Sequence, residues 1–453
     1  MPTLSLILAF LVSASPVHAA GPATRPVTRE FELVAAPAKL PLIDGRMLDV
    51  WAYNGQVPGP TLRIKVGERL RVRFRNALPQ PTTIHWHGLR LPNGMDGVPG
   101  VTQPPIAPGE TFIYEFTASD AGTFWFHPHL RGSEQLERGL FGVLIVEDER
   151  PPAFSREVIW VLDDWLLGAD GQIFPEFNTR HDLAHDGRWG DAITVNGRKS
   201  PTLVVRAGER LRIRLLNVAN GRVFTPDFGA LQAKVIAFDG LYADEPLPPD
   251  GLEIAPGNRV DLDVIIPASL RGKKVSVVDR SYARQVNALI DVAVVDEEPL
   301  PLPEVSVAGR GDARRYLEEE PRSPAIDYRL NARAGGPMGI EWTLNEQAFR
   351  HEEGKRHAHP APTVRLPLGK WSRLRFINES FRLHPMHTHG QFFRVLSRDG
   401  KAVDERHWRD TVLVHAKETV EVAVLARDPG KWMLHCHIQE HAESGMMSLF
   451  EVR

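Results

Sequence analysis

Short runs rich in apolar residues, many with polar residues at alternate positions, recur along this chain. Examples are TFIYEF at 111–116, GLFGVLIV at 139–146 and TVEVAVL at 419–425. Gly and Pro separate these runs, and few stretches have the period of an amphipathic helix. A period of two is typical of half-buried strands, so the pattern predicts an all-β chain. One short helix is expected near the end, at residues 436–443.

Three windows of 17 residues share one pattern. They are PTLRIKVGERLRVRFRN at 60–76, PTLVVRAGERLRIRLLN at 201–217 and PTVRLPLGKWSRLRFIN at 362–378. Each begins with Pro-Thr, has Gly at its eighth position and ends with Asn, as two strands joined by a turn would. The windows recur at intervals of 141 and 161 residues, each the length of a domain. The repeat predicts three β-sandwich domains.

Acidic and Pro-rich stretches at 147–152 and 296–304 separate the repeats. We place domain one at 25–149, domain two at 152–297 and domain three at 326–453, with a linker at 298–325. Residues 1–20 contain an apolar run and end in small residues, which is typical of a secretory signal peptide. The sequence therefore predicts a periplasmic or secreted protein. No membrane anchor is expected, because no later segment has the ~18 apolar residues of a transmembrane helix.

The composition is that of an ordinary globular protein, with 453 residues, 42% hydrophobic and 25% charged, and a net charge of -3. This balance lacks the basic bias of a protein that binds nucleic acid or anionic membrane, so neither partner is expected. Cys436 is the single cysteine and cannot form an internal disulfide, although an oxidising compartment favours such bridges. Cys436 is therefore a buried residue without a chemical role, an exposed reactive thiol or a metal ligand.

Histidine pairs of the form H-x-H recur in register with the repeats. They are His85 and His87, His127 and His129, His387 and His389, and His435 and His437. The first pair of domains one and three begins nine residues after the final Asn of the repeat, and the second pair begins five residues after Gly122 or Gly430. Domain two has Pro226 and Phe228 at the first place and, by a weaker alignment, Val277 and Asp279 at the second. Domain two therefore lacks the pairs.

Residues i and i+2 of a strand point to the same side, so each pair directs two imidazoles at one target. Four pairs from two related domains place eight imidazoles around a shared space at the domain interface. One H-x-H pair is weak support for a metal site, but four pairs in matched register predict one.

By the same alternation, Cys436 points away from this space and into domain three. We expect it to meet His384, His441 and Met446 there, with Met447 as the neighbouring alternative to Met446. Two imidazoles, one thiolate and a weak axial thioether are the ligands of a mononuclear blue-copper site. Thiolate disfavours magnesium and calcium, and a structural zinc site does not ordinarily use methionine.

The motifs HWHG, HPH, HPMHTHG and HCHIQEHAESGM resemble, in order, the four copper motifs of the multicopper oxidases. The resemblance covers the chain after the signal peptide. It implies the bacterial laccase-like layout of three cupredoxin-like Greek-key β-sandwich domains, with four copper ions bound by the first and third. The implied ligands are His384, Cys436, His441 and Met446 for type 1, His85 and His387 for type 2, His87, His127 and His437 for one type 3 ion, and His129, His389 and His435 for the other.

The resemblance also implies an oxidase. A donor gives single electrons to the type 1 copper, whose histidine edge lies near the surface, and Cys436 passes them to the trinuclear cluster, where dioxygen becomes water. Asp96 matches an acid that lies near the type 2 copper in related proteins, although an Asp in a Gly-rich turn often makes only an Asx-turn. Ala442 stands where many bacterial relatives have a second acid. Glu440 and Glu443 flank that position.

More than one class of compound is a candidate for the electron donor. Phenols and aromatic amines lead, and a cuprous or ferrous ion is the main alternative. Dedicated cuprous oxidases of this family often carry a methionine-rich segment over the type 1 site, and the eight methionines here form no such cluster. A cupredoxin scaffold that only binds protein is disfavoured, because every ligand position is intact. We expect a monomer.

Other histidines and aromatic residues receive structural interpretations. HEEGKRHAH at 351–359 is interpreted as a solvated insertion rather than a metal site. His181 and His185 are expected at the surface. Trp86 and Trp125 adjoin ligands and are expected to stiffen the site by packing rather than to carry electrons.

Overall fold

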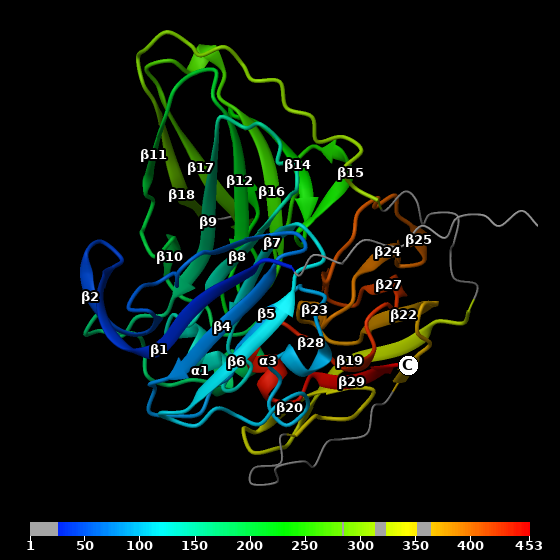
Figure 1. Cartoon of the computed structure of the whole chain (residues 1–453). Helices are drawn as coiled ribbons and strands as arrows, with labels where there is room; N and C mark the ends of the chain where they lie inside the picture. Colours follow the sequence, from blue (N-terminus) through cyan, green and yellow to red (C-terminus); the bar gives the residue numbers. More distant parts are fainter. Residues whose placement is uncertain (1–25, 283–284, 313–322, 351–363) are drawn as a thin grey trace, which may run out of the picture.

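The computed structural model describes residues 26–282, 285–312, 323–350 and 364–453. Within these ranges the chain forms six β-sheets and only short helices, which confirms the all-β prediction. Figure 1 shows three groups of strands, with the green middle part of the chain above the blue and the orange-red parts. The predicted signal peptide and the 351–359 insertion lie outside the described residues.

In the described part of domain one, the strands form two four-stranded sheets. The first, in the order β2-β1-β4-β6, contains β1 (Thr28–Leu42), β2 (Arg46–Tyr53), β4 (Arg69–Asn76) and β6 (Thr111–Thr117). The second, in the order β3-β8-β7-β5, contains β3 (Leu62–Lys65), β5 (His85–His87), β7 (Gly122–His127) and β8 (Gly142–Glu147). Consecutive strands such as β3 and β4 lie in different sheets, so the chain crosses repeatedly between the two layers, as in a Greek-key sandwich.

Domain two repeats this plan with a larger first sheet. Its order is β10-β9-β12-β16-β14-β15, from β9 (Arg156–Trp165), β10 (Ala192–Val195), β12 (Arg210–Asn217), β14 (Gln232–Phe238), β15 (Leu241–Leu247) and β16 (Arg259–Ile265). The second sheet has the order β11-β18-β17-β13, from β11 (Thr202–Val205), β13 (Pro226–Asp227), β17 (Lys274–Tyr282) and β18 (Gln285–Val294).

Domain three has the same two layers. Its first sheet has the order β20-β19-β22-β27-β24-β25, from β19 (Ile326–Ala334), β20 (Ile340–Leu344), β22 (Trp371–Asn378), β24 (Phe393–Arg398), β25 (Lys401–Ala402) and β27 (Thr419–Leu425). The second has the order β21-β29-β28-β23-β26, from β21 (Val364–Leu366), β23 (His384–Thr388), β26 (Thr411–Val414), β28 (Gly430–Cys436) and β29 (Met447–Val452).

The three repeated windows form the same pair of strands in each domain, namely β3 and β4, β11 and β12, and β21 and β22. The shared glycine turns the chain between them, with φ of +81° at Gly67, +85° at Gly208 and +70° at Gly369. A side chain is strained in this left-handed region, which is why the window has glycine there. The predicted turn between two strands is confirmed.

The asparagine that ends each window shapes the loop that follows. The side-chain amide of Asn378 donates to the carbonyls of Arg382 and His415 at 2.7 and 2.8 Å, and its oxygen accepts from the backbone of Ser380 at 2.9 Å. Asn76 and Asn217 make the same kinds of bond in their own domains. Because this loop leads into the first H-x-H strand, the asparagine explains the constant spacing of nine residues.

Buried apolar side chains join domains one and three into one continuous cluster, which includes Trp86, Phe126, Trp432 and Cys436. Domain two has a cluster of its own. A further cluster, with Trp125 and Trp165, packs between domains one and two. The interface between domains one and three is therefore part of a core, which holds groups on its two sides at fixed positions.

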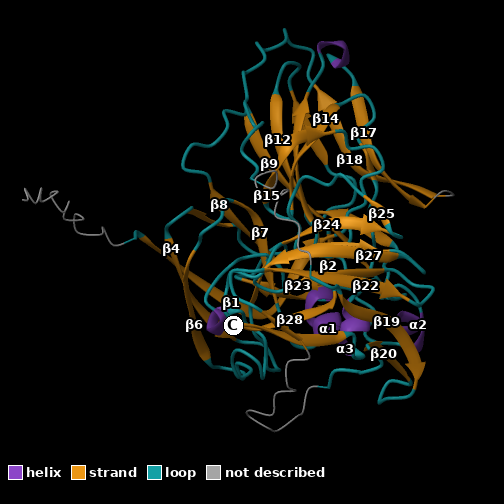
Figure 2. Ribbon diagram, turned by 90° about the vertical axis from the view of Figure 1, so that its right-hand side faces the viewer, coloured by secondary structure: helices purple, strands orange, loops and turns teal. Residues whose placement is uncertain are grey.

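The helices of the described residues are short. They are α1 (Gly132–Glu137), α2 (Arg180–Ala184), α3 (Gln439–Glu443) and the 3₁₀ turns η1 (Asn93–Met95) and η2 (Ala268–Leu270). Figure 2 shows α1, α2 and α3 in purple, gathered near β19 and β20. The helix predicted at 436–443 is confirmed as α3. In the described ranges, no helix has the length and apolar character to cross a bilayer.

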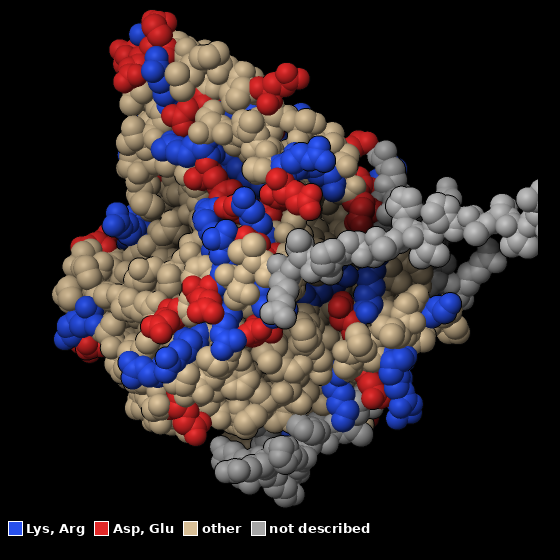
Figure 3. Space-filling view, in the orientation of Figure 1, with Lys and Arg blue, Asp and Glu red and all other residues tan. Residues whose placement is uncertain are grey.

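Charged side chains of both signs mix on the face seen in Figure 3, where Lys and Arg lie among Asp and Glu. Ion pairs join residues of different strands, such as Arg71 with Glu115 and Arg63 with Glu157. Exposed pairs of this kind contribute little to stability, so the fold rests on its apolar core.

Gly122, at the start of β7, lies against a turn of domain two. A Cβ at this position would stand 2.1 Å from the carbonyl oxygen of Gly240. We expect Gly122→Ala to lower the free energy of unfolding by about 1–3 kcal/mol, because backbone must move to admit the methyl group. Gly94→Ala is the control, since a Cβ there meets nothing within 4 Å. Denaturant unfolding of both variants measures the difference, and equal stabilities would contradict the close approach.

Candidate metal centres

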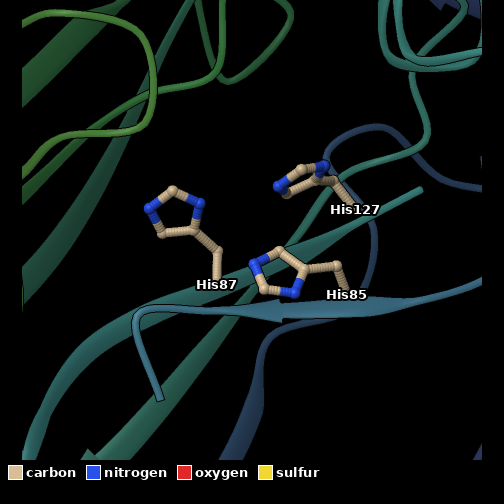
Figure 4. A group of neighbouring side chains, drawn as sticks. All are labelled: His85, His87 and His127. Carbon is tan, nitrogen blue, oxygen red and sulfur yellow. The ribbon is translucent and has the colours of Figure 1, made fainter. Parts of the chain in front are cut away.

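Eight histidines converge between domains one and three. His85 in β5 lies opposite His127 in β7, and His387 in β23 lies opposite His435 in β28. Figure 4 shows His85, His87 and His127 directed from their strands toward one space. In domain two the matching strands place Pro226 opposite Asp279. The weaker alignment of domain two was therefore wrong by two residues, because Asp279 occupies the place of His127 rather than that of His129.

Imidazole rings from the two domains meet face to face. His85 stacks on His389, and His87 stacks on His387, each with 3.8 Å between ring centroids. The remaining rings also pair across the interface, with 5.4 Å from His127 to His437 and 5.1 Å from His129 to His435. Seven of the eight are buried, and His129 is partly exposed. The predicted gathering of eight imidazoles around one space is present.

Five ring nitrogens of this cluster are buried and have no hydrogen-bond partner within the described structure. They are Nε2 of His85, His127, His387 and His437, and Nδ1 of His87. The Nε2 atoms of the other three rings face one another, with 3.0 Å from His389 to His435 and 3.4 Å from His129 to His435. Buried polar atoms without partners cost free energy, whereas a cation between such nitrogens satisfies them. The residues therefore fit a group of metal ions.

The opposite ring nitrogens are held by backbone oxygens. The Nδ1 atoms of His85, His127, His387 and His435 donate to the carbonyls of Asp96, Pro128, Asp410 and Cys436 at 2.8, 2.8, 2.9 and 2.8 Å. A ring N–H that donates leaves the other nitrogen as the lone-pair atom, which is the form that binds metal. Burial and nearby histidines lower the pKa of His127 and His437 and lower that of His435 to about 3, so the rings stay neutral.

Cys436 lies on the other face of β28 and meets two histidines. Its Sγ is 3.6 Å from Nδ1 of His384 and 3.8 Å from Nδ1 of His441, and the two nitrogens are 3.3 Å apart. Burial raises the pKa of the Cys436 thiol. A bound soft cation replaces the thiol proton, so metal binding and deprotonation occur together. The triangle formed by Sγ of Cys436 and the Nδ1 atoms of His384 and His441 fits one soft cation.

The pairing of β28 with β29 distinguishes the two methionines. Met447 lies opposite His435, and residues directly opposed in a ladder share one face of the sheet. Met447 is therefore on the histidine side, whereas the fully buried Met446 belongs to the same apolar cluster as Cys436. This arrangement favours Met446 over Met447 as the axial ligand beside Cys436, as the spacing predicted.

The histidines of the Cys436 site are covered by protein. His384 and His441 are both fully buried. Nε2 of His384 contacts the hydroxyl of Ser380 at 2.9 Å, and Nε2 of His441 donates to the carbonyl of His185 at 2.7 Å. The resemblance implied a histidine edge near the surface. The structure places the His441 edge directly beneath a segment of domain two.

Asp96 lies at the histidine cluster, as predicted. It is buried, and its carboxylate accepts from Nδ1 of His389 at 2.9 Å and lies 3.2 Å from Nδ1 of His85. One carboxylate thus contacts a ligand candidate from each domain. A role limited to an Asx-turn does not account for these contacts.

Sequence reasoning missed Asp410 and Arg259. The carboxylate of Asp410 lies 3.3 Å from Nε2 of His87, and both of its oxygens accept from Arg259, at 2.9 and 2.6 Å. Arg259 begins β16 of domain two and also donates to the carbonyl of Thr123 in domain one at 3.2 Å. Burial opposes the ionisation of Asp410, but Arg259 and His387 together outweigh it and lower the pKa of Asp410. No spacing pattern could have linked residues 151 positions apart.

A cavity of about 200 Å³ adjoins the histidine cluster, and His127, His129, His435, Ala442 and Glu443 are among its lining residues. Burial raises the pKa of Glu443 to about 7. An acid therefore faces this cavity from the position after Ala442. The Glu443 carboxylate also accepts from the backbone N–H of Ser133 at 2.8 Å and from the amide of Asn178 at 2.7 Å. Glu440 accepts from the hydroxyl of Ser133 at 2.5 Å and from the amide of Asn220 at 3.0 Å.

Tryptophans beside the ligands pack against the site, as expected. Trp86 and Trp125 are fully buried, and the Trp125 ring stacks on His127 with 4.1 Å between centroids. His181 and His185 are exposed, which also agrees with the expectation.

Three family models described as multicopper oxidase match this chain, at residues 37–151, 156–271 and 328–453. The chain belongs to the multicopper oxidase family. The laccase-like resemblance is thereby confirmed at the level of the family. As a multicopper oxidase, the protein binds copper and is an oxidoreductase that passes electrons from a donor to dioxygen.

Relatives of this multicopper oxidase match nearly its full length. A multicopper oxidase of Staphylococcus aureus is 26% identical over 94% of this chain and 88% of its own. One of Mycobacterium tuberculosis is 28% identical over 91% of this chain and 85% of its own. The crystal structure of a multi-copper oxidase from Pseudomonas thermotolerans is 34% identical with a TM-score of 0.82, and the match covers 94% of this chain and 100% of that chain. The predicted cupredoxin-like fold is confirmed.

Replacing Arg259 by Met leaves Asp410 as a buried carboxylate without its guanidinium partner. We expect the free energy of unfolding to fall by about 3–5 kcal/mol, the usual cost of removing one member of a buried ion pair. Guanidinium unfolding of the metal-free protein measures this. The matched control is Arg29→Met, because Arg29 pairs with Glu68 at the surface, and its expected cost is below about 1 kcal/mol. Similar losses in both variants would refute a special role for Arg259.

Proposed function

We propose that this oxidase binds four copper ions and couples four one-electron oxidations of a donor to the reduction of dioxygen to water. The proposed ligands are His384, Cys436, His441 and Met446 for type 1, His85 and His387 for type 2, His87, His127 and His437 for one type 3 ion, and His129, His389 and His435 for the other. One observation carries this assignment. The five unpartnered nitrogens belong to the type 2 set and the first type 3 set, whereas the three that face one another form the second type 3 set.

Bound copper supplies the one-electron transfer and the reduction of dioxygen. The chain supplies position and protection. His435 and His437 face the eight-histidine cluster while Cys436 faces His384 and His441, so three consecutive residues link the two centres covalently. Their burial keeps water away from both centres, which strengthens the electrostatic interactions there.

Dioxygen reduction also consumes protons, and two carboxyl groups are placed to deliver them. Asp96 contacts ligand candidates from both domains. Glu443 lines the cavity beside three ligand candidates and has a pKa of about 7. An acid whose pKa is close to neutral can both give a proton and regain it. We assign proton delivery to Asp96 and the second route to Glu443.

The donor does not touch the type 1 histidines directly, because both are covered. Organic donors are supported by a solved laccase-like multi-copper oxidase from Ochrobactrum, which is 25% identical to this chain with a TM-score of 0.77 and has oxidase activity towards lignin model compounds. A metal-ion donor is supported by copper resistance protein A of Escherichia coli and an iron transport multicopper oxidase of Epichloe festucae, each 25% identical to this chain. Either donor must pass its electron through the covering segment.

Location, assembly and domain limits complete the proposal. The apolar amino terminus supports export to the periplasm or the medium, with a mature protein that acts as a monomer without a membrane anchor. The Pro-rich and acidic stretches between the repeats support domains at 25–149, 152–297 and 326–453, joined by the linker at 298–325.

Replacing Cys436 by Ser tests the type 1 assignment. We expect the copper-loaded wild type to show the intense visible absorption of thiolate-to-copper charge transfer and the variant to lack it, because serine provides no soft thiolate. Absorption and electron paramagnetic resonance spectra of both proteins are the measurement. A colourless wild type after copper loading, with copper content confirmed, would refute the type 1 assignment.

Replacing Asp96 by Asn tests proton delivery. Asparagine keeps an oxygen that accepts from His389 but has no acidic proton, so we expect oxygen uptake to fall about a hundredfold, in the usual range for loss of a general acid. Reduction of the type 1 absorption by the donor without oxygen should keep its rate. Oxygen-electrode and stopped-flow measurements separate the two steps. The control Asp96→Glu should retain more activity, and equal losses in both steps would exclude a role confined to proton delivery.

A further inference from the structure

Two consecutive residues of domain three, Asp410 and Thr411, contact histidines from domains one and three. The backbone carbonyl of Asp410 accepts from Nδ1 of His387 at 2.9 Å, and the hydroxyl of Thr411 lies 3.0 Å from the same nitrogen. The Asp410 carboxylate lies 3.3 Å from Nε2 of His87 in domain one. One short segment thus contacts a histidine of the cluster from each of the two domains.

The contact with Asp410 decides which nitrogen of His87 is free to bind a metal ion. An ionised carboxylate can only accept a hydrogen bond, so Nε2 of His87 carries the proton and Nδ1 is the lone-pair atom. Nδ1 of His87 is buried and has no partner in the described structure, whereas the other four unpartnered nitrogens of the cluster are Nε2 atoms. Asp410 therefore orients His87 in the opposite sense to its neighbours.

Asp410 is a positioning residue rather than a ligand. One of its carboxylate oxygens lies within 4.8 Å of a nitrogen of His87 and a nitrogen of His387, which is close enough for an ion to bind all three. However, the nitrogens that face Asp410 carry protons. A cation there would also meet the positive charge of Arg259, which binds both oxygens of the Asp410 carboxylate.

Three residues of domain two hold this segment in place. The carboxylate of Asp239 accepts from the backbone N–H groups of Asp410 and Thr411 at 3.1 and 3.2 Å. The side-chain amide of Asn258 donates to the carbonyl of Thr411 at 3.0 Å, and Arg259 donates to the Asp410 carboxylate at 2.9 and 2.6 Å. All five residues are buried. We call Asp239, Asn258 and Arg259 the domain-two clamp.

Hydrogen bonds within domain two fix the clamp residues relative to one another. Asp239 accepts from the amide of Asn258 at 3.0 Å and from the backbone N–H of Arg259 at 3.1 Å. The guanidinium of Arg259 donates to the carbonyls of Gly257 and Asp239 at 3.0 and 2.8 Å. Because each buried polar group is satisfied by the next, the loss of one member disturbs the others. The clamp therefore holds its position only as part of docked domain two.

We propose that domain two controls the binding of copper at the eight-histidine cluster by holding Asp410 and Thr411, an inference that rests on the four-copper function proposed above. With the clamp intact, His87 and His387 direct their lone pairs into the cluster. When the clamp is weakened, both rings lose an orienting partner, and the cluster binds copper less tightly. The Cys436 site keeps its affinity, because its two histidines hydrogen-bond to other residues.

The coupling acts in both directions. If the docking of domain two raises the affinity of the cluster for copper, then copper stabilises the docked domain by the same factor. Domain two, which has no histidine at the matching positions, is thereby stabilised by copper that the other two domains bind.

The test compares copper-loaded wild type with Arg259→Met and with Arg259→Lys, which keeps the charge but loses the planar fork that binds both oxygens. Loss of a group that orients a metal ligand typically lowers metal affinity about 10–100-fold. We expect a loss of this size at the cluster in Arg259→Met and a smaller one in Arg259→Lys. Competition with a copper chelator, followed by a count of bound copper, measures the affinity. The visible type 1 absorption should not change.

Unfolding measures the coupling from the other side. Copper should raise the denaturant midpoint of wild type by more than it raises that of Arg259→Met, because the variant gains less from an occupied cluster.

Arg214→Met is the matched control. Arg214 is also a buried arginine of domain two. It pairs with Asp261 at 3.1 Å and binds domain one through the hydroxyl of Thr123 at 2.7 Å. Its ion pairs in the described structure are with Asp261 and Glu157, so it contacts no carboxylate of domain three. Arg214→Met should weaken the docking of domain two on domain one and leave the copper affinity of the cluster unchanged.

An unchanged copper affinity of the cluster in Arg259→Met would overturn the proposal. If that variant does not fold, Arg259→Lys decides, and an unchanged affinity there would overturn it as well. Equal losses of copper in Arg214→Met and Arg259→Met would also overturn it, because they would indicate a general loosening of domain two. A wild type that lacks type 1 absorption or binds fewer than four copper ions would instead overturn the four-copper function, which keeps the two failures distinct.

Discussion

A buried ion pair between Arg259 and Asp410 ties the three domains of this multicopper oxidase together at its metal centre. Arg259 belongs to domain two. It donates hydrogen bonds to a backbone carbonyl of domain one and to both carboxylate oxygens of Asp410 in domain three. Removing two charges from water costs several kcal/mol for each ion, and paired hydrogen bonds offset that cost only when the geometry is good. The same carboxylate contacts His87 of domain one. An arginine of domain two therefore holds the carboxylate that contacts a histidine of the cluster.

The eight-histidine cluster imposes a second constraint, because it brings neutral rings together with their lone pairs directed at a common space. Without a cation this arrangement leaves buried nitrogens unsatisfied, and it persists only if the surroundings are rigid. The apolar cluster that runs without a break from domain one into domain three meets this need. The stability of the core therefore supports a geometry that the site residues alone would not adopt.

Domain two lacks histidines at the matching positions and contributes other groups to the site. Pro226 and Asp279 stand opposite each other where domains one and three have histidines. The domain provides Arg259, which binds Asp410 beside the histidine cluster, and His185, whose carbonyl binds His441. A segment of domain two therefore lies over the Cys436 site, whose histidines His384 and His441 are fully buried.

The amino-acid sequence by itself determined the strands, the repeated windows and the residues that present metal-binding atoms, because these depend on local periodicity. An H-x-H pair in a strand needs only a period of two to direct both rings to one side, and Cys436 is directed oppositely for the same reason. The roles of Asp410, Arg259 and Glu443 depended on tertiary structure, since a lone charged residue carries no sign of the distant groups it will meet. The cover over His441 is a backbone carbonyl, which every residue type possesses, so no side chain could mark it. Tertiary structure alone decided which groups orient and cover the histidines, because those contacts join residues that are far apart in the chain.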